Sequence, residues 1–304
     1  MTEAVLLYNP AAGRFPLSQK RLSLLLQSLR QQGVMAQPVC TRLPSRAVSR
    51  LDPNSTEPLQ PTPEDSGLDL DGKDRLIVYG GDGTLHEAFR LAAPWNIPVA
   101  LLPAGTANVL ARELGISLRL KDALAIAASG TVRNIYLGEA SGRYFHLMAG
   151  IGLDADVIAR VPPGLKRTLG IGAYWLTGLA ALWNCPLRPF HVTLDGTEWE
   201  ASFAVIANAR LYGGHLLMAP QASVYQECLD VCLFTSNHKT RFLNYLWGVL
   251  RRRHLDYPDV VYRKVQRVEV TGDPSVPVQM DGELVGNLPM SFSVFSRGVQ
   301  IVVP

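Results

Sequence analysis

The spacing of apolar residues predicts strand–loop–helix units in the first part of the chain. Four short apolar runs are typical of buried strands: Ala4–Tyr8, Val34–Thr41, Leu76–Tyr79 and Val99–Leu102. Apolar residues at helical spacing follow three of these runs, in Leu22–Leu29, Leu85–Ala92 and Ala107–Leu114. Strands that alternate with helices indicate a parallel sheet covered by helices.

From about Thr131 the pattern changes to short β-rich segments joined by glycine, aspartate and proline. Two pairs of segments flank an Asp-Gly dipeptide, which favours a type I′ hairpin turn. They are Phe190–Leu194 with Thr197–Ile206, and Val276–Met280 with Glu283–Val285. We therefore expect an α/β domain over residues 1–131 and a mainly antiparallel β domain, a β-sandwich, over residues 132–304. The last residues are expected to pack back on the first domain.

Two stretches of the second half are expected to be helical. Leu169–Trp183 is apolar nearly all round, but it is shorter than the roughly 20 residues that a membrane span needs. We therefore interpret it as a buried or groove-lining helix. Contact with the membrane interface is the alternative. Arg241–Leu255 carries Leu243, Leu246, Trp247 and Leu250 on one face and ends in Arg251–Arg253. This second helix is either an ordinary amphipathic helix or a contact with an anionic membrane surface.

Composition narrows the class of protein. Apolar residues make up 47% and charged residues 18%, which indicates a globular protein with a large core, and a net charge of +3 does not argue for a nucleic-acid partner. Residues 52–74 are rich in proline and acids, so we expect a flexible insert that builds no core.

The N-terminal residues and the cysteines favour a cytoplasmic protein. The first ten residues include Glu3 and only a short apolar run, unlike a signal peptide. The four cysteines lack zinc-ligand spacing and are expected to be small buried apolar groups in a reducing compartment.

A glycine-rich loop, Gly80-Gly81-Asp82-Gly83-Thr84, joins a predicted strand to a predicted helix. This arrangement is typical of phosphate sites. Glycines let the anion come close to the backbone, and the N-terminus of a helix is partially positive. Asp82 would repel phosphate unless a cation lay between, which suggests Mg²⁺ carried by a nucleotide. The alternative is a tight turn without a ligand. Thr84 and Glu87 match a capping box at the helix start.

Two more loops follow predicted strands, Asn9–Gly13 and Pro103–Asn108. Loops at the carboxyl ends of parallel strands gather at one edge of the sheet, where ligands bind. We therefore expect all three loops to line one cleft.

These motifs together resemble one family, the bacterial diacylglycerol kinase and sphingosine kinase-like lipid kinases. The resemblance covers nearly the whole chain and rests on five motifs in order: NPAAG at 9–13, GGDGT at 80–84, PAGTAN at 103–108, GIGLDADV at 150–157 and MDGE at 280–283. It implies a nucleotide-binding α/β domain, a C-terminal β-sandwich and a cleft between them. GGDG alone is shared with NAD kinases.

The resemblance also implies the roles of particular residues. Asp281 or Glu283 would be the general base, although Asp281-Gly282 read alone is only a hairpin turn. Asp82 would face the metal of Mg-ATP. The nucleotide contacts would come from Asn9, Pro10, Gly13, Thr41, Gly80, Gly81, Asp82, Gly83, Thr84, Glu87, Gly105, Thr106 and Asn108.

The function implied is an ATP-dependent lipid kinase that uses Mg²⁺ and phosphorylates a lipid hydroxyl of diacylglycerol or sphingoid/ceramide type. Its partners would be the lipid and a membrane surface that it contacts peripherally from the cytoplasm, and a homodimer is compatible with the sequence. A soluble nucleotide kinase of NAD-kinase type and a non-catalytic lipid- or nucleotide-binding module are the alternatives.

The chain departs from the family pattern after Pro220-Gln221-Ala222. Members with a structural magnesium carry an acidic Asp-Asp-Gly loop there, whereas this chain has Val224–Cys228. We therefore expect no second magnesium, with Glu227 or Asp230 as partial substitutes for the loop.

Overall fold

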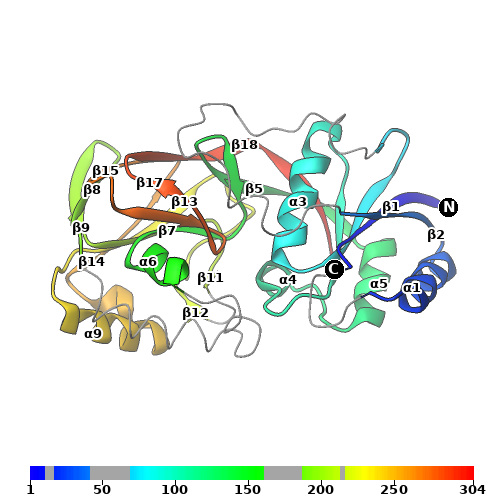
Figure 1. Cartoon of the computed structure of the whole chain (residues 1–304), viewed down its shortest axis with the longest axis horizontal. Coiled ribbons are helices and arrows are strands. Elements are labelled where there is room, and N and C mark those ends of the chain that lie inside the picture. The colour runs from blue at the N-terminus through cyan, green and yellow to red at the C-terminus, as the bar shows by residue number, and fades with distance from the viewer. Residues whose placement is uncertain (11–16, 42–68, 161–186, 213–215) are drawn as a thin grey trace. The chain divides into compact units, whose positions relative to one another are not determined.

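A computed structural model describes residues 1–10, 17–41, 69–160, 187–212 and 216–304 (Figure 1). The described residues form two compact units. The first contains the residues up to Ile135 together with Arg297–Pro304, and the second contains Tyr136–Ser296. The predicted fold class is confirmed, because the first unit carries a parallel sheet with helices and the second is mainly antiparallel β.

The parallel sheet of the first unit has the strand order β2-β1-β3-β4. Its strands are β1 (Thr2–Tyr8), β2 (Val34–Cys40), β3 (Arg75–Gly80) and β4 (Val99–Pro103). The end of β18 (Met290–Val303) runs parallel beside β4, with Ile301 opposite Val99. The register pairs Tyr8 with Cys40 and Tyr79, and Gly80 with Pro103, so the four strands end at the same edge.

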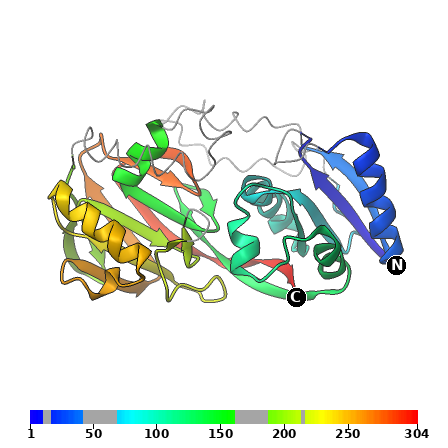
Figure 2. The same ribbon diagram turned by 90° about the horizontal axis from the view of Figure 1, so that it is seen from below.

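Helices cover both faces of this sheet, as Figures 1 and 2 show for α1 and α3. Leu25 and Leu29 of α1 and Ala123 and Ala127 of α5 pack in one core with alternate strand residues such as Ile77. The helices of this unit are α1 (Gln19–Gln31), α3 (Asp82–Ala92), the 3₁₀ helix η2 (Ala93–Trp95), α4 (Val109–Glu113) and α5 (Leu120–Ser129).

The second unit is built from antiparallel strands around one core. One sheet has the order β14-β13-β10-β7-β16-β17, and the facing strands are β18, β15, β8 and β9, with β5 and β6. Phe145, Ile151, Phe190 and Phe292 from both sets are fully buried between them. The strands are β5 (Thr131–Ala140), β6 (Arg143–Phe145), β7 (Met148–Gly152), β8 (Phe190–Leu194), β9 (Thr197–Ala201), β10 (Phe203–Ala207), β11 (Leu211–Tyr212), β12 (Leu216–Leu217), β13 (Leu229–Phe234), β14 (Val260–Val265), β15 (Arg267–Gly272), β16 (Pro277–Met280) and β17 (Glu283–Asn287).

Within the ranges that the structure describes, three helical segments accompany these strands: α6 (Leu153–Arg160), α9 (Lys239–Leu250) and the 3₁₀ helix η3 (His254–Asp256). Helix α9 packs on the six-stranded sheet through Phe242 and Tyr245, which contact the rings of Phe203 and Phe234. Arg241 fixes its first turn through two 2.7 Å hydrogen bonds to the Asp259 carboxylate, and the Tyr245 hydroxyl donates to the same group.

Both predicted Asp-Gly hairpins are present. Asp195 and Gly196, like Asp281 and Gly282, have positive φ, as a type I′ turn requires. The predicted strand Thr197–Ile206 is wrong in one respect, because the chain leaves β9 at Ser202 and continues as β10 in the other sheet.

Two other expectations need correction. The expectation that 52–74 contributes nothing to a core is wrong at its end, where Leu70 is fully buried and the Asp74 carboxylate accepts from the Glu3 N–H at 2.8 Å. Cys232 is buried as expected, whereas Cys40 ends the edge strand β2 and is exposed. Leu169–Trp183, Cys185 and residues 52–68 lie outside the described residues.

The Arg241–Asp259 pair predicts an acid-dependent stability. Hydrogen bonds from Arg241 lower the pKa of Asp259 to about 2, below the value of about 3.9 expected in the unfolded chain. The stabilisation is therefore complete above about pH 4 and is lost as pH falls towards about 2.

Asp259→Asn and Arg241→Met each remove this contribution, so their deficit in unfolding free energy relative to wild type should shrink between about pH 4 and about pH 2. Denaturant unfolding over a pH series measures the deficit. A deficit that stays constant across this range would contradict the assignment.

Candidate functional site

The loops that follow β3 and β4 touch through their backbones. A Cβ atom built on Gly105 would lie 2.5 Å from the Cα of Gly81, and one on Gly81 would lie 2.9 Å from the Cα of Gly105. Real Cβ atoms do not approach so closely, so this contact admits only glycine at both positions. The Ala104 N–H donates to the Gly80 carbonyl at 2.8 Å and adds a second link between the loops.

Asp82 joins the same two loops from the first turn of α3. Its Oδ2 accepts from the Val109 N–H and its Oδ1 from the Leu110 N–H, both at 3.1 Å. These are the first N–H groups of α4, which have no partner inside their own helix. Each carboxylate oxygen retains a second lone pair for a metal or a metal-bound water.

Asn108 closes the second loop. Its side chain accepts from the Gly105 N–H and donates to the Gly105 carbonyl, both at 2.9 Å. Its φ of 47° is in the left-handed region, which asparagine tolerates better than most residues. The role of Asn108 in this structure is thus to hold Gly105 against Gly81.

The predicted capping box at Thr84 and Glu87 is wrong. Helix α3 begins at Asp82, its N-cap is Gly81, and no side chain caps it. Glu87 lies a full turn further in and accepts from Arg90 Nε at 3.2 Å instead. The T-x-x-E pattern is present, but the close contact of Gly81 with Gly105 sets the helix start two residues before Thr84.

The other predicted nucleotide contacts lie on or beside this edge of the sheet. Thr41 directly follows β2, and its Oγ1 is shielded from solvent without a hydrogen-bond partner in the described part of the chain. Asn9 and Pro10 follow β1, Thr84 is half-buried in the first turn of α3, and Thr106 is exposed in the second loop. Gly13 lies outside the described residues.

These features fit a nucleotide phosphate. Gly80, Gly81 and Gly83 present backbone without side chains, the 11-residue helix α3 begins among them, and the Thr41 hydroxyl offers a donor. Carboxylate oxygens such as those of Asp82 are the ligands that Mg²⁺ prefers. The nucleotide and metal roles of these residues stay predictions.

In the second unit, Asp281 is held by the backbone at the start of β7. Its Oδ1 accepts from the Leu147 and Met148 N–H groups at 2.9 and 3.0 Å, and its Oδ2 accepts from the His146 N–H at 2.8 Å. His146 Nδ1 lies 2.8 Å from the same Oδ2, and this histidine side chain is only 1% exposed. Asp281 therefore fixes the turn between β16 and β17, while Glu283 begins β17 and is exposed.

Sequence reasoning assigned no role to three residues beside this turn. Gln279 is buried, donates to Asp154 Oδ2 at 2.6 Å and accepts from the Gly282 N–H at 2.8 Å. The Tyr212 hydroxyl donates to the other Asp154 oxygen. Burial raises the pKa of Asp154, and the two hydrogen bonds oppose this rise. Asp154 belongs to the GIGLDADV motif, but Gln279 and His146 carry no sequence signal beyond a polar residue in an apolar run.

In the region of the missing acidic loop, the side chain of Lys264 supplies a positive charge. Lys264 Nζ donates to the Gln221 carbonyl and to Gln226 Oε1, both at 2.8 Å, and lies 3.7 Å from Asp230 Oδ2. Asp230 is 1% exposed and its Oδ1 accepts from the Tyr262 hydroxyl at 2.6 Å. Burial raises the pKa of Asp230, whereas Tyr262 and Lys264 act to lower it. Lys264 thus neutralises one of the carboxylates considered as a substitute for the loop.

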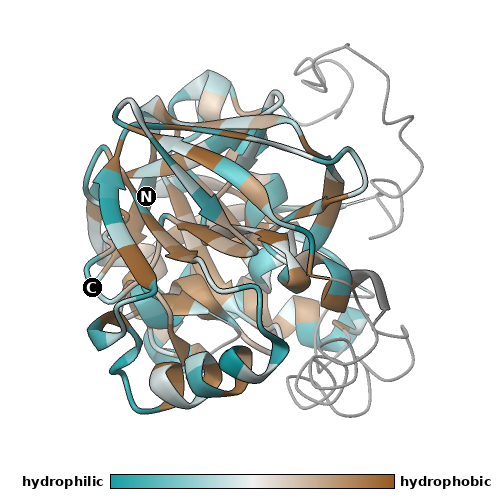
Figure 3. Cartoon of the chain, turned by 90° about the vertical axis from the view of Figure 1, so that its left-hand side faces the viewer, coloured by the Kyte–Doolittle hydropathy of each residue, from teal (hydrophilic) through white to brown (hydrophobic). Residues whose placement is uncertain are grey.

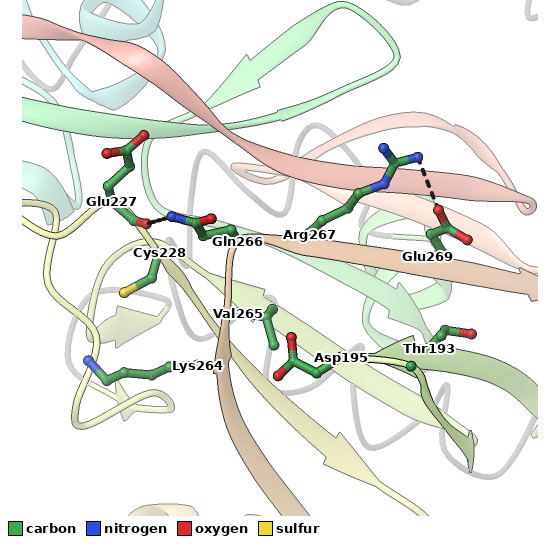
Figure 4. A pocket seen from close by; sticks show the side chains of 10 residues that line it. Thr193, Asp195, Glu227, Cys228, Lys264, Val265, Gln266, Arg267 and Glu269 are labelled. Atoms are coloured by element: carbon green, nitrogen blue, oxygen red, sulfur yellow. Dashed lines mark hydrogen bonds and ion pairs between the residues drawn. The ribbon is translucent and has the colours of Figure 1, made fainter.

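Lys264 also lines an open depression of about 600 Å³ (Figure 4). In it, the Gln266 side chain donates to the Glu227 carbonyl, and Arg267 pairs with Glu269. None of the predicted catalytic or nucleotide-binding residues lines this depression, although Glu227, considered above as a substitute for the acidic loop, does. We assign it no role in catalysis.

Comparisons with known proteins match both units. The diacylglycerol kinase catalytic domain matches residues 3–140, and the YegS C-terminal NAD kinase beta sandwich-like domain matches residues 148–303. A diacylglycerol kinase of Bacillus subtilis is 29% identical, over 100% of this chain and 97% of the relative. A probable lipid kinase YegS-like of Pseudomonas aeruginosa is 33% identical, over 75% of this chain and 76% of the relative.

A diacylglycerol kinase structure from Bacillus anthracis has the same fold. It superposes with a TM-score of 0.72 at 23% identity and covers 99% of this chain and 97% of its own. At this identity the likeness supports the fold alone.

Replacing Gly105 with alanine should separate the two glycine loops. We expect Gly105→Ala to lower the free energy of unfolding by about 1–3 kcal/mol, because its Cβ would meet the Gly81 backbone as well as the Asn108 side chain. Gly83→Ala is the matched control, because a Cβ at Gly83 has no atom within 4 Å. Alanine within a helix should raise the free energy of unfolding by about 0.5–1 kcal/mol relative to glycine. Denaturant unfolding measures both, and equal effects would contradict the close contact.

Lys264→Met should leave the buried Asp230 carboxylate without its cation. We expect a loss of about 1–3 kcal/mol in unfolding free energy. Arg267→Met is the control from the same depression, because Arg267 and Glu269 form an exposed ion pair that contributes little. Wild-type stability in Lys264→Met would show that Asp230 needs no cation.

Proposed function

Because the chain belongs to the family of diacylglycerol kinases and YegS-like lipid kinases, we propose that it transfers the γ-phosphate of ATP to the hydroxyl of a lipid. The observation that carries this proposal is the locked pair of glycine loops at the carboxyl edge of the parallel sheet. Phosphoryl transfer depends mainly on positioning and charge neutralisation, which such a fixed backbone supplies.

The nucleotide belongs to the first unit in this proposal. Gly80–Thr84 and Gly105–Asn108 hold the phosphates, Thr41 donates a hydrogen bond, and Asp82 faces a magnesium ion carried by ATP. Magnesium neutralises charge on the phosphates when bound. The two N–H groups of α4 keep the Asp82 carboxylate oriented before any ligand arrives.

The general base belongs to the second unit. We propose Asp281 as the acceptor of the lipid hydroxyl proton, oriented by three backbone N–H groups and His146. All lone-pair directions of its carboxylate face a donor or the His146 ring, so proton transfer requires one of these contacts to lengthen. Glu283 is the second candidate.

A diacylglycerol-type lipid is the proposed acceptor, supported by the name of the Bacillus subtilis relative. Sphingoid bases and ceramide present the same hydroxyl beside long chains and are the alternatives. No helix in the described ranges is long and apolar enough to cross a bilayer. We propose that the protein works in the cytoplasm and reaches its lipid peripherally at the membrane surface.

The test is transfer of phosphate from ATP to lipids in mixed micelles with Mg²⁺, with products identified by mass spectrometry. Asp281→Asn should lower kcat by about 10²–10⁴-fold if it is the base. It should also lower the unfolding free energy by about 1–3 kcal/mol, because an amide NH₂ then faces a backbone N–H.

Asp195→Asn is the matched control, since Asp195 occupies the same position in the other type I′ turn but is exposed. It should retain wild-type activity. Full activity in Asp281→Asn together with a large loss of activity in Glu283→Gln would identify Glu283 as the general base instead. Phosphorylated NAD without any lipid product would replace the proposal by a soluble nucleotide kinase, and ATP binding without turnover would favour a non-catalytic module.

A further inference from the structure

Helix α9 has two apolar faces, and only one of them is covered in the described structure. Its buried residues are Phe242, Tyr245, Gly248 and Val249, which pack inward. Leu243, Trp247 and Leu250 lie on the opposite side at spacing i, i+4 and i+7, with exposed fractions of 40%, 53% and 51%. Figure 3 shows apolar and polar residues alternating along this helix at the lower edge of the view.

The helix is firmly anchored, so this exposure is not a frayed end. The Arg241–Asp259 pair fixes its first turn, and the Arg251 and Arg253 N–H groups donate to the Trp247 and Gly248 carbonyls at its end. The rings of Phe242 and Tyr245 hold its inner face against Phe203 and Phe234. The outer apolar residues therefore keep a fixed arrangement in water.

Positive charge borders this apolar stripe. Arg251, Arg252 and Arg253 follow the last turn and are all exposed. The Arg251 guanidinium lies 4.3 Å from the centre of the Trp247 ring, while Arg253 pairs with Asp256. A tryptophan and leucines flanked by arginines match the interface of an anionic bilayer, where the apolar residues enter the acyl boundary and the arginines bind phosphate headgroups.

We infer that the stripe of Leu243, Trp247 and Leu250 with Arg251–Arg253, the α9 outer face, attaches this chain to an anionic lipid bilayer. The inference deepens the proposed function, because a lipid acceptor is reached at such a surface. A second copy of the chain fits this face less well, since in a two-fold contact the face would meet itself and it carries no carboxylate to pair with Arg251 and Arg252.

The test is sedimentation with vesicles in the absence of ATP. Wild type should bind vesicles of equal parts phosphatidylcholine and phosphatidylglycerol more tightly than vesicles of phosphatidylcholine alone, and added salt should weaken the binding. Trp247→Ser with Leu250→Ser should lower the partition coefficient about tenfold or more. Arg252→Asn should lower it about fivefold and suits the left-handed backbone at Arg252, where φ is 58°.

Leu24→Ser is the matched control, because Leu24 is 54% exposed on α1 and lies in the other unit. It should bind vesicles like wild type. Unchanged binding of the Trp247/Leu250 variant, or an equal loss in Leu24→Ser, would overturn the inference. So would a wild-type dimer that the double variant converts to a monomer without any change in vesicle binding.

A kinase assay separates this inference from the proposed function. The double variant should lose activity on acceptor lipid in limiting vesicles by the same factor as its binding, and should keep wild-type activity on a short-chain acceptor dissolved in water. If wild type phosphorylates no lipid but the variants bind vesicles as expected, the proposed function is wrong while the inference about the α9 outer face is supported.

Discussion

The contact between Gly81 and Gly105 is the constraint on which the candidate nucleotide site depends. Two backbones this close exclude every side chain at both positions and fix the distance between the loops. Asn108 then holds its loop in place, and Asp82 can reach the first N–H groups of α4 only because the loops are adjacent. The two glycines therefore fix the backbone at this edge of the sheet without any bound ligand.

Both units use an aspartate to collect backbone N–H groups. Asp82 accepts two of them across the loops of the first unit, and Asp281 accepts three from the start of β7. A carboxylate removed from water requires such donors, since an unmatched one is costly to bury. The same donors keep each carboxylate in one orientation. Asp82 and Asp281 therefore hold the fold together and are also the residues proposed to take part in the reaction. A loss of activity in a variant of either residue has to be compared with its loss of unfolding free energy.

The sequence predicts best what depends on near neighbours. The strand–loop–helix units follow from apolar periodicity, and both hairpins follow from Asp-Gly turns that need positive φ. The capping box fails because a contact with Gly105, distant in sequence, decides where α3 starts. The burial of Leu70 and the Lys264–Asp230 pair likewise depend on residues brought together only by the fold. His146 and Gln279 give no local signal, since a polar residue in a strand is meaningful only once its partner is known.

Helix α9 shows how tertiary packing overrides a local pattern. The sequence offers Leu243, Leu246, Trp247 and Leu250 as one apolar face and Phe242, Tyr245 and Val249 as another. The second face is the buried one, because its aromatic rings contact those of Phe203 and Phe234 and the Tyr245 hydroxyl donates to Asp259. A leucine face gains only from burial, whereas the aromatic face adds ring contacts and a hydrogen bond to an ionised partner. The leucine and tryptophan side is consequently left in water beside three arginines, and a bilayer with anionic headgroups satisfies both its apolar and its charged parts.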